Sequence, residues 1–168
     1  MTSSARDDEV DLVIDAWSRH LPDVDLTPLD VMSRLRRVSL RLARVRASAF
    51  ASAGLASWEF DVLAALRRRP EPHELNPAQL IEVTMIGSAA MTNRLDKLTT
   101  RQLVERRPND LDRRSILVRL TAEGAERVDA AMTELARLEA EELGVLSAQD
   151  QATLARILRQ LLDGHSPR

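Results

Sequence analysis

The segment from Met91 to Thr121 constrains the fold more than any other part of the chain. It contains the sequences MTNRLDKL, LVERRP and DRRSILVRLT, in this order. The first predicts a helix, and the other two predict strands that are joined by a basic turn. Such a helix fits the major groove of DNA, and an arginine-tipped hairpin beside it can contact the same duplex. The segment therefore favours a DNA-binding element.

Charge is unevenly distributed along the 168 residues, whose formal net charge is −2. Between Arg94 and Arg119, eight basic and four acidic residues give a local excess of four positive charges. Such a basic island in an acidic chain indicates a surface for phosphate groups. A solvated surface of mutually paired charges explains the same pattern equally well.

The composition argues against several classes of site. The chain has no Cys, and His20, His73 and His165 lie too far apart for the usual spacing of metal ligands. It shows neither a glycine-rich phosphate loop nor a nucleophile–base arrangement, so we expect no cofactor, no metal, no catalytic residue and no enzyme activity. The N-terminus lacks the features of a signal peptide, and the longest uncharged run, Ala47 to Trp58, is too short to span a bilayer. We therefore expect a cytoplasmic protein without a membrane partner.

Hydrophobic periodicity predicts a mainly α-helical chain with a small β-wing. Helices are expected over residues 7–20, 27–53, 57–68, 76–82, 88–100, 121–143 and 147–163. Strands are expected over residues 104–107 and 116–120. In the third helix, Phe60, Leu63, Ala64 and Leu66 are expected to face the core, and in the sixth helix Val128, Met132, Leu135 and Leu138 are expected to lie on one face.

We expect one domain, residues 1–168, in which residues 55–121 form a winged helix-turn-helix head. Residues 7–53 and 122–163 are expected to supply helices for dimerisation and for a ligand pocket. These helices carry two apolar stripes, Val31, Leu35, Val38, Leu42, Val45 and Ala49 in one and Leu154, Ile157, Leu158, Leu161 and Leu162 in the other. A homodimer with interlocked terminal helices would bury both stripes and hold two heads at the spacing of a palindromic DNA site. The alternative is that the stripes pack on the head of their own chain.

From Leu55 to about Ala131 the chain resembles the MarR family of bacterial winged-helix regulators. The matching motifs are FDVL at 60–63, LNP at 75–77, MTNRLD at 91–96, LVER at 103–106, DRR at 112–114 and LT at 120–121. The resemblance implies a recognition helix whose DNA-binding residues are Ser88, Thr92, Asn93, Arg94 and Lys97. It also implies a wing in which Arg114 enters the minor groove, Asp112 orients Arg114, and Arg113 contacts the DNA backbone.

The chain departs from this family at three positions. Gly87 stands where a Ser often caps the recognition helix, and Ala89 stands where close relatives have Gly. Gln102 stands where a Gly usually follows this helix, often in a left-handed conformation. That conformation would cost Gln102 roughly 1 kcal/mol. None of the three departures removes a predicted DNA-contacting side chain.

A narrower resemblance, to the urate-responsive branch of the family, concerns a ligand. That branch has an extra N-terminal helix with a Trp, together with an Asp and two Arg near the head, and the corresponding residues here are Trp17, Asp61, Arg94 and Arg106. The resemblance implies that the indole stacks on a planar heterocycle and that Arg106 pairs with its negative charge. Asp61 would accept hydrogen bonds from the ring, or hold Arg94 or Arg106 while the pocket is empty. Each residue also has a structural explanation: Trp17 can anchor its helix in the core, Asp61 can form a structural ion pair, and Arg94 can contact only DNA.

These features predict a homodimeric, ligand-responsive DNA-binding regulator. We expect a repressor that is released from palindromic promoter DNA by a small planar anion such as urate. One alternative keeps the fold but responds to another aromatic acid or purine. A second alternative is a winged-helix adaptor that does not bind DNA. The expected partners are therefore double-stranded DNA, a small-molecule effector and a second copy of the chain.

Overall fold

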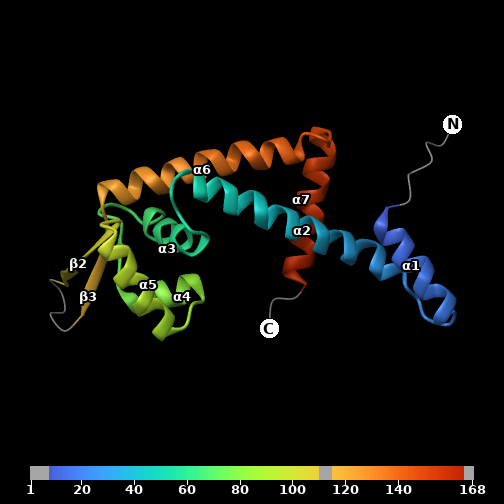
Figure 1. Ribbon diagram of the computed structural model, residues 1–168, viewed down its shortest axis with the longest axis horizontal. Coiled ribbons are helices and arrows are strands. Elements are labelled where there is room, and N and C mark those ends of the chain that lie inside the picture. The colour runs from blue at the N-terminus through green and yellow to red at the C-terminus, as the bar shows by residue number, and fades with distance from the viewer. Residues whose placement is uncertain (1–7, 110–114, 165–168) are drawn as a thin grey trace. The chain divides into compact units, whose positions relative to one another are not determined.

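The computed structural model describes residues 8–109 and 115–164 (Figure 1). They form α1 (Glu9–His20), α2 (Thr27–Ser52), α3 (Ser57–Arg67), β1 (Glu74–Leu75), α4 (Pro77–Thr84), α5 (Ser88–Thr100), β2 (Val104–Pro108), β3 (Ile116–Leu120), α6 (Ala122–Leu143) and α7 (Ala148–Asp163). The chain divides into two compact units, Met1–Arg44 and Val45–Arg168, with the boundary inside α2. We call them the N-terminal unit and the C-terminal unit. The predicted fold class, mainly helical with a small antiparallel sheet, is confirmed.

The predicted helices and strands are present, and the differences lie mainly at their ends. α4 continues two residues beyond the predicted end, and β2 includes Pro108. α2 begins at Thr27, and Asp25 accepts hydrogen bonds from the N–H (3.0 Å) and the hydroxyl (2.7 Å) of Thr27. β1 was not predicted, because two residues are too few to show an alternating pattern.

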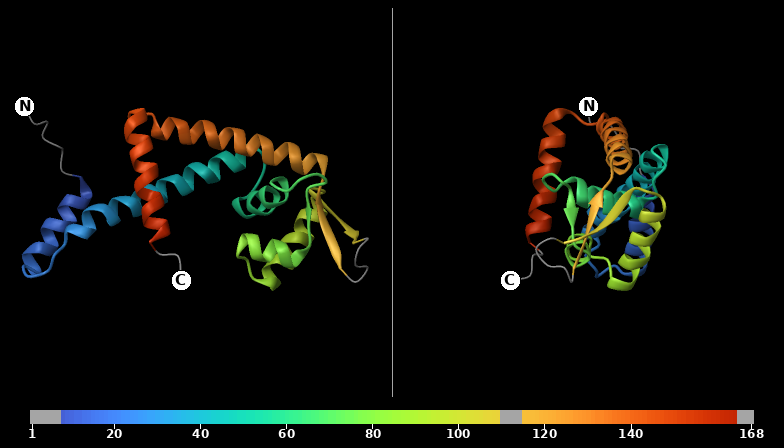
Figure 2. Two further views of the ribbon diagram at one scale, coloured as in Figure 1. Left: turned by 180° about the vertical axis from the view of Figure 1, so that it is seen from behind. Right: turned by 90° about the vertical axis from the view of Figure 1, so that its left-hand side faces the viewer.

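The sheet belongs to the C-terminal unit and has the antiparallel order β1-β3-β2 (Figure 2). Leu75 pairs with Val118 and Val104 pairs with Leu120, and all four side chains are buried. The neighbouring row, which includes Arg119, lies on the opposite face because successive residues of a strand alternate in direction. β2 and β3 thus form the base of the predicted wing.

α3 lies at the centre of the core of the C-terminal unit, where it packs against α4, α6 and β3. Its four predicted core residues are buried, and Phe60 stacks on Phe50 with ring centroids 3.9 Å apart. Met132, one of the four residues predicted to lie on one face of α6, is 46% exposed. The buried residues of α6 instead include Val128, Ala131 and Leu135, whose spacing places them along one side of the helix.

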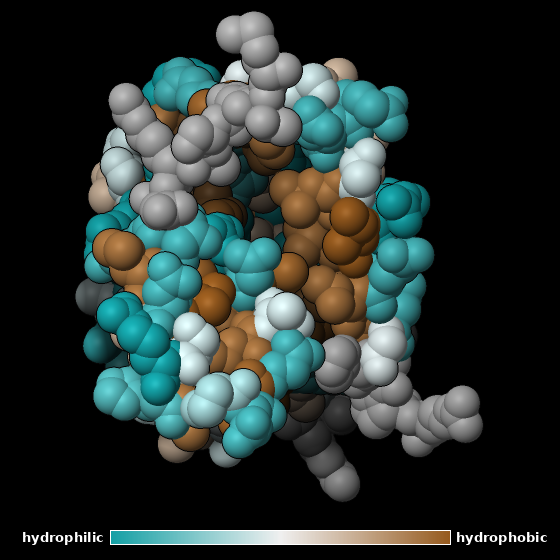
Figure 3. Space-filling view, turned by 90° about the vertical axis from the view of Figure 1, so that its right-hand side faces the viewer, coloured by the Kyte–Doolittle hydropathy of each residue, from teal (hydrophilic) through white to brown (hydrophobic). Residues whose placement is uncertain are grey.

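Several helices carry apolar side chains that remain open to solvent, and Figure 3 shows such apolar surface among polar side chains. α7 contributes no buried residue, although Leu154, Ile157 and Leu161 form an apolar stripe along it. Val31 and Val38, from the predicted seam of α2, are also exposed. Within the described ranges, no single helix is long and apolar enough to cross a membrane; only α2 and α3 taken together, across a bend, reach such a length and composition.

The turn between α5 and β2 anchors the start of α6. Gln102 adopts the predicted left-handed conformation, with φ of 58°. The hydroxyl of Thr121 donates to the carbonyl oxygen of Gln102 (2.8 Å) and accepts a hydrogen bond from the N–H of Gly124 (3.0 Å). Gly124 is buried so closely against this turn that a Cβ atom there would lie 2.1 Å from the carbonyl oxygen of Leu103. This packing holds α6 against the end of α5.

Replacing Gly124 tests this packing. Gly124→Ala should lower the free energy of unfolding by about 1–3 kcal/mol, because the extra methyl group must displace backbone. Gly87→Ser is a suitable control, because a Cβ at Gly87 has no neighbour within 4 Å. That control should change stability by only about 0.5 kcal/mol or less. Urea unfolding followed by circular dichroism measures both, and equal stability of Gly124→Ala and the parent would contradict the described packing.

Candidate DNA interface and effector residues

The buried side of α5 determines which of its side chains face solvent. Met91, Leu95 and Leu98 are buried in the core of the C-terminal unit. α5 follows α4 after a tight turn in which Met85 is left-handed, with φ of 53°, and Gly87 caps α5 without a side chain. The exposed side carries four of the five predicted recognition residues, namely Ser88, Thr92, Asn93 and Lys97. A surface of hydroxyl, amide and ammonium groups can donate hydrogen bonds to base edges and phosphates.

Arg94, the fifth predicted recognition residue, lies at the edge of this exposed side and is half-buried. Its guanidinium carbon lies 5.5 Å from the centre of the Trp58 ring, at the start of α3. Arg94 forms no hydrogen bond or ion pair with any other described residue. Trp58 had no predicted role, since a single aromatic residue one position before a buried stretch forms no pattern that indicates a function.

Four other members of the basic island are paired with acidic residues. Arg101 binds Glu59, Arg106 binds Asp96, Arg107 binds Glu74, and Arg119 binds Glu105, with N–O distances of 2.5, 2.7, 2.7 and 3.7 Å. The alternative of a salt-bridged surface therefore describes these four arginines. Arg94 and Lys97 are different, because neither forms an ion pair within the described part of the chain.

Three predicted wing residues, Asp112, Arg113 and Arg114, lie outside the described residues. The described base of the wing is closed by Asn109 and Ser115. The N–H of Asn109 donates to the Ser115 carbonyl oxygen (3.1 Å), and its side-chain amide donates to the Ser115 hydroxyl (3.0 Å).

The four residues predicted to bind the effector fall into both units. Asp61 is exposed on α3, and it forms neither of the expected ion pairs with Arg94 and Arg106. Arg106 instead binds Asp96, because β2 packs beside α5 and brings these side chains together. Arg106 is therefore linked directly to the helix that carries the recognition residues.

Trp17 belongs to the N-terminal unit, where it lies on α1 and is 52% exposed. α1 is fastened to α2 within this unit by Arg34, which binds Asp8 (2.9 Å), Asp11 (2.8 Å) and Asp30. The hydrogen bond from Arg34 lowers the pKa of Asp11. The half-exposed indole of Trp17 is therefore not enclosed in a core within the described residues.

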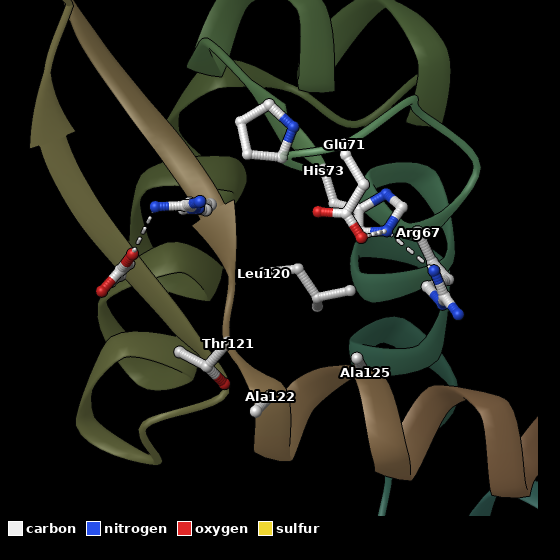
Figure 4. Close-up of a pocket in the computed structure, with 10 residues that line it drawn as sticks. Arg67, Glu71, His73, Leu120, Thr121, Ala122 and Ala125 are labelled. Atoms are coloured by element: carbon white, nitrogen blue, oxygen red, sulfur yellow. Dashed lines mark hydrogen bonds and ion pairs between the residues drawn. The ribbon is translucent and has the colours of Figure 1, made fainter.

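An open pocket of about 460 Å³ lies between α3, the sheet and the start of α6 (Figure 4). It contains none of the four predicted effector residues, since its lining comprises Arg67, Glu71, Pro72, His73, Glu105, Arg119, Leu120, Thr121, Ala122 and Ala125. Arg67 donates to both carboxylate oxygens of Asp129 (2.9 Å each), which lowers the pKa of Asp129. Arg67 also donates to Nε2 of His73 (2.8 Å). The charged groups around this pocket thus bind one another.

Comparison with known proteins identifies the family of the chain. The MarR family model matches residues 53–115. The transcriptional regulator PecS of Dickeya dadantii is 34% identical over 150 residues, which are 89% of this chain and 90% of PecS. The chain belongs to the MarR family of transcriptional regulators.

Other MarR-family proteins match over most of their length. The transcriptional repressor NicR of Pseudomonas putida is 28% identical over 83% of this chain and 89% of NicR. A MarR variant from Escherichia coli, solved in complex with operator DNA, superposes with a TM-score of 0.67 and 28% identity. That superposition covers 83% of this chain and 99% of the other. The winged helix-turn-helix fold is therefore shared with a protein that was crystallised on DNA.

Proposed function

We propose that this MarR-family protein is a homodimeric repressor that binds palindromic promoter DNA and is released by a small planar anion such as urate. The observation that carries DNA binding is the exposed side of α5. There, Ser88, Thr92, Asn93 and Lys97 face solvent, and the one acidic residue beside them, Asp96, is neutralised by Arg106. The operator-bound structure of a relative supports the same use of this fold.

Arg94 and Lys97, which form no ion pair with any described residue, provide a test of DNA binding. Lys97→Gln and Arg94→Gln should each weaken promoter binding by about 1–3 kcal/mol, because each removes a contact to phosphate or base. Lys97→Gln should also reduce the salt dependence of log K by about one unit. Fluorescence anisotropy of a labelled promoter fragment, recorded at several salt concentrations, measures both effects.

Arg159→Gln is the matched control, because it removes one exposed positive charge from α7 rather than from α5. Its promoter affinity should equal that of the parent. If the affinity of the parent protein for promoter DNA is no higher at low salt than at high salt, the proposed DNA binding is wrong and the winged-helix adaptor is the remaining alternative.

Arg114→Gln extends the test to the wing and should weaken binding to all DNA sequences alike.

The apolar stripe of α7 supports the proposed dimer. Leu154, Ile157 and Leu161 are each about 40% exposed although they lie on one side of an amphipathic helix. The alternative, in which these helices pack on their own head, would bury that stripe, but α7 has no buried residue. A second copy could cover it and would place two heads on a palindromic site.

Leu158→Asp should convert the dimer to a monomer, because it places an unpaired charge in the proposed interface. Gln160→Asp, which adds the same charge away from the stripe, should leave the dimer intact. Sedimentation velocity at micromolar concentration distinguishes the two states. A folded, stable monomer of the parent protein at that concentration would rule out the proposed assembly.

The ion pair between Asp96 and Arg106 supports a route for release by an anion. A planar anion that binds Arg106 competes with Asp96, since a guanidinium presents one planar fork to carboxylate-like groups. Asp96 would then be unpaired beside the recognition residues and would repel DNA phosphates. The ligand would thus favour a state that DNA disfavours, which is the requirement for release. In this proposal, Trp17 stacks on the ring of the anion, and Asp61 accepts hydrogen bonds from the ring N–H groups.

Urate should release labelled promoter DNA from the parent protein. Arg106→Gln leaves Asp96 unpaired and should therefore bind the promoter more weakly without urate, and added urate should weaken that binding much less than in the parent. Arg107→Gln is the control, because Arg107 is the neighbouring arginine but binds Glu74 on β1. Trp17→Phe and Asp61→Asn should raise the urate concentration that releases half of the DNA. Equal release from these variants and the parent would refute the site. If urate releases no DNA from the parent, another purine or aromatic acid is the effector, and the same variants test it.

A further inference from the structure

We infer that Trp58 is a positioning residue for DNA recognition: its indole ring holds the Arg94 guanidinium on α5 with its N–H groups free to bind a DNA phosphate. This inference rests on the proposed DNA binding and names a residue that acts through Arg94. Two observations support it: the guanidinium carbon of Arg94 lies over the Trp58 ring, 5.5 Å from its centre, and the N–H groups of Arg94 are not used in a hydrogen bond or ion pair by other described residues.

The adjacent residue of α3 offers an internal comparison. Glu59 binds Arg101, which lies seven residues after Arg94 and therefore on the same side of α5. The guanidinium of Arg101 donates one hydrogen bond to the Glu59 carboxylate (2.5 Å) and one to the carbonyl oxygen of Gly54 (2.8 Å). The start of α3 thus holds Arg94 of α5 and Arg101, the C-cap of α5, in different ways. The Glu59 carboxylate accepts a hydrogen bond from Arg101, whereas the Trp58 ring contacts only the face of the Arg94 guanidinium.

This difference has a chemical consequence. A guanidinium that lies over a ring face is attracted by the ring quadrupole, and all five N–H donors remain at its edge. Trp58 itself is half-buried and packs against the core, so it is a fixed support. Holding a long side chain in one orientation removes part of the entropy cost of forming a contact to phosphate. Trp58 should therefore increase DNA affinity without touching DNA.

A double-mutant cycle tests the inference with the full-length protein and its promoter fragment. The variants are Trp58→Met, which keeps an apolar side chain but removes the ring, Arg94→Gln, and the combination of both. Trp58→Met should weaken binding by about two- to five-fold in the parent, as expected for an exposed cation–π contact. It should have no further effect in the Arg94→Gln background, because its partner is absent there. Trp58→Phe, which keeps a ring, should restore most of the affinity.

Two further measurements separate positioning from general stability. In a Trp17→Phe background, where Trp58 is the one indole left in the chain, Arg94→Gln should shift the emission of Trp58 in the absence of DNA. Arg101→Gln is the control for stability: it should lower the melting temperature yet leave the emission unshifted, since Arg101 binds Glu59 and not the ring. Trp58→Met should keep the salt dependence of the parent, because it removes no charge.

The inference is overturned if Trp58→Met weakens binding equally with and without Arg94, since its effect would then come from the fold alone. It is also overturned if Trp58→Met leaves affinity unchanged or increases it, because the ring would then not assist Arg94 or would hold it away from DNA. These outcomes differ from failure of the proposed function, in which the parent protein itself does not bind the promoter. If Trp58→Met does not fold, Trp58→Phe and the emission measurement still decide between the outcomes.

Discussion

The burial of Met91, Leu95 and Leu98 is the constraint on which the candidate DNA interface depends. Each buried aliphatic side chain contributes about 1.5–3 kcal/mol, so α5 cannot turn about its axis without losing several such contributions. The spacing of these residues leaves Thr92 and Asn93 on the solvent side. Packing in the core, rather than the polar residues themselves, therefore determines what this helix presents to a partner.

Ion pairing then divides the basic island into two groups. Four arginines bind acidic residues of neighbouring elements. A solvent-exposed pair contributes only about 0–1 kcal/mol, whereas Glu59 is buried and would be left as an uncompensated charge without Arg101. Arg101 and Arg106 orient the end of α5 against α3 and β2, and Arg107 and Arg119 link strands of the sheet. Arg94 and Lys97 form the other group, because neither is paired with an acidic residue within the described part of the chain.

The same interactions suggest how a ligand and DNA could influence each other. Arg106 joins β2 to α5 through Asp96, and Trp58 joins α3 to α5 through Arg94. A small molecule bound beside α5 can act on the recognition residues through either contact, because both contacts end on a side chain of α5. In contrast, the open pocket behind the sheet has its charges satisfied by one another, and it offers no such connection to α5. Coupling in this protein would therefore involve the sides of α5 that contact α3 and β2.

The sequence by itself determined the order and nearly all the bounds of the elements, because apolar spacing, caps and turn residues are local signals. It also determined the family, through motifs within residues 55–121. Tertiary structure alone decided that Asp96 rather than Asp61 binds Arg106, and that Arg94 stacks on Trp58. These partners come from different elements, and their meeting depends on how α3, α5 and β2 pack. Periodicity shows which face of a helix is buried, but only packing shows which side chain of another element lies against it.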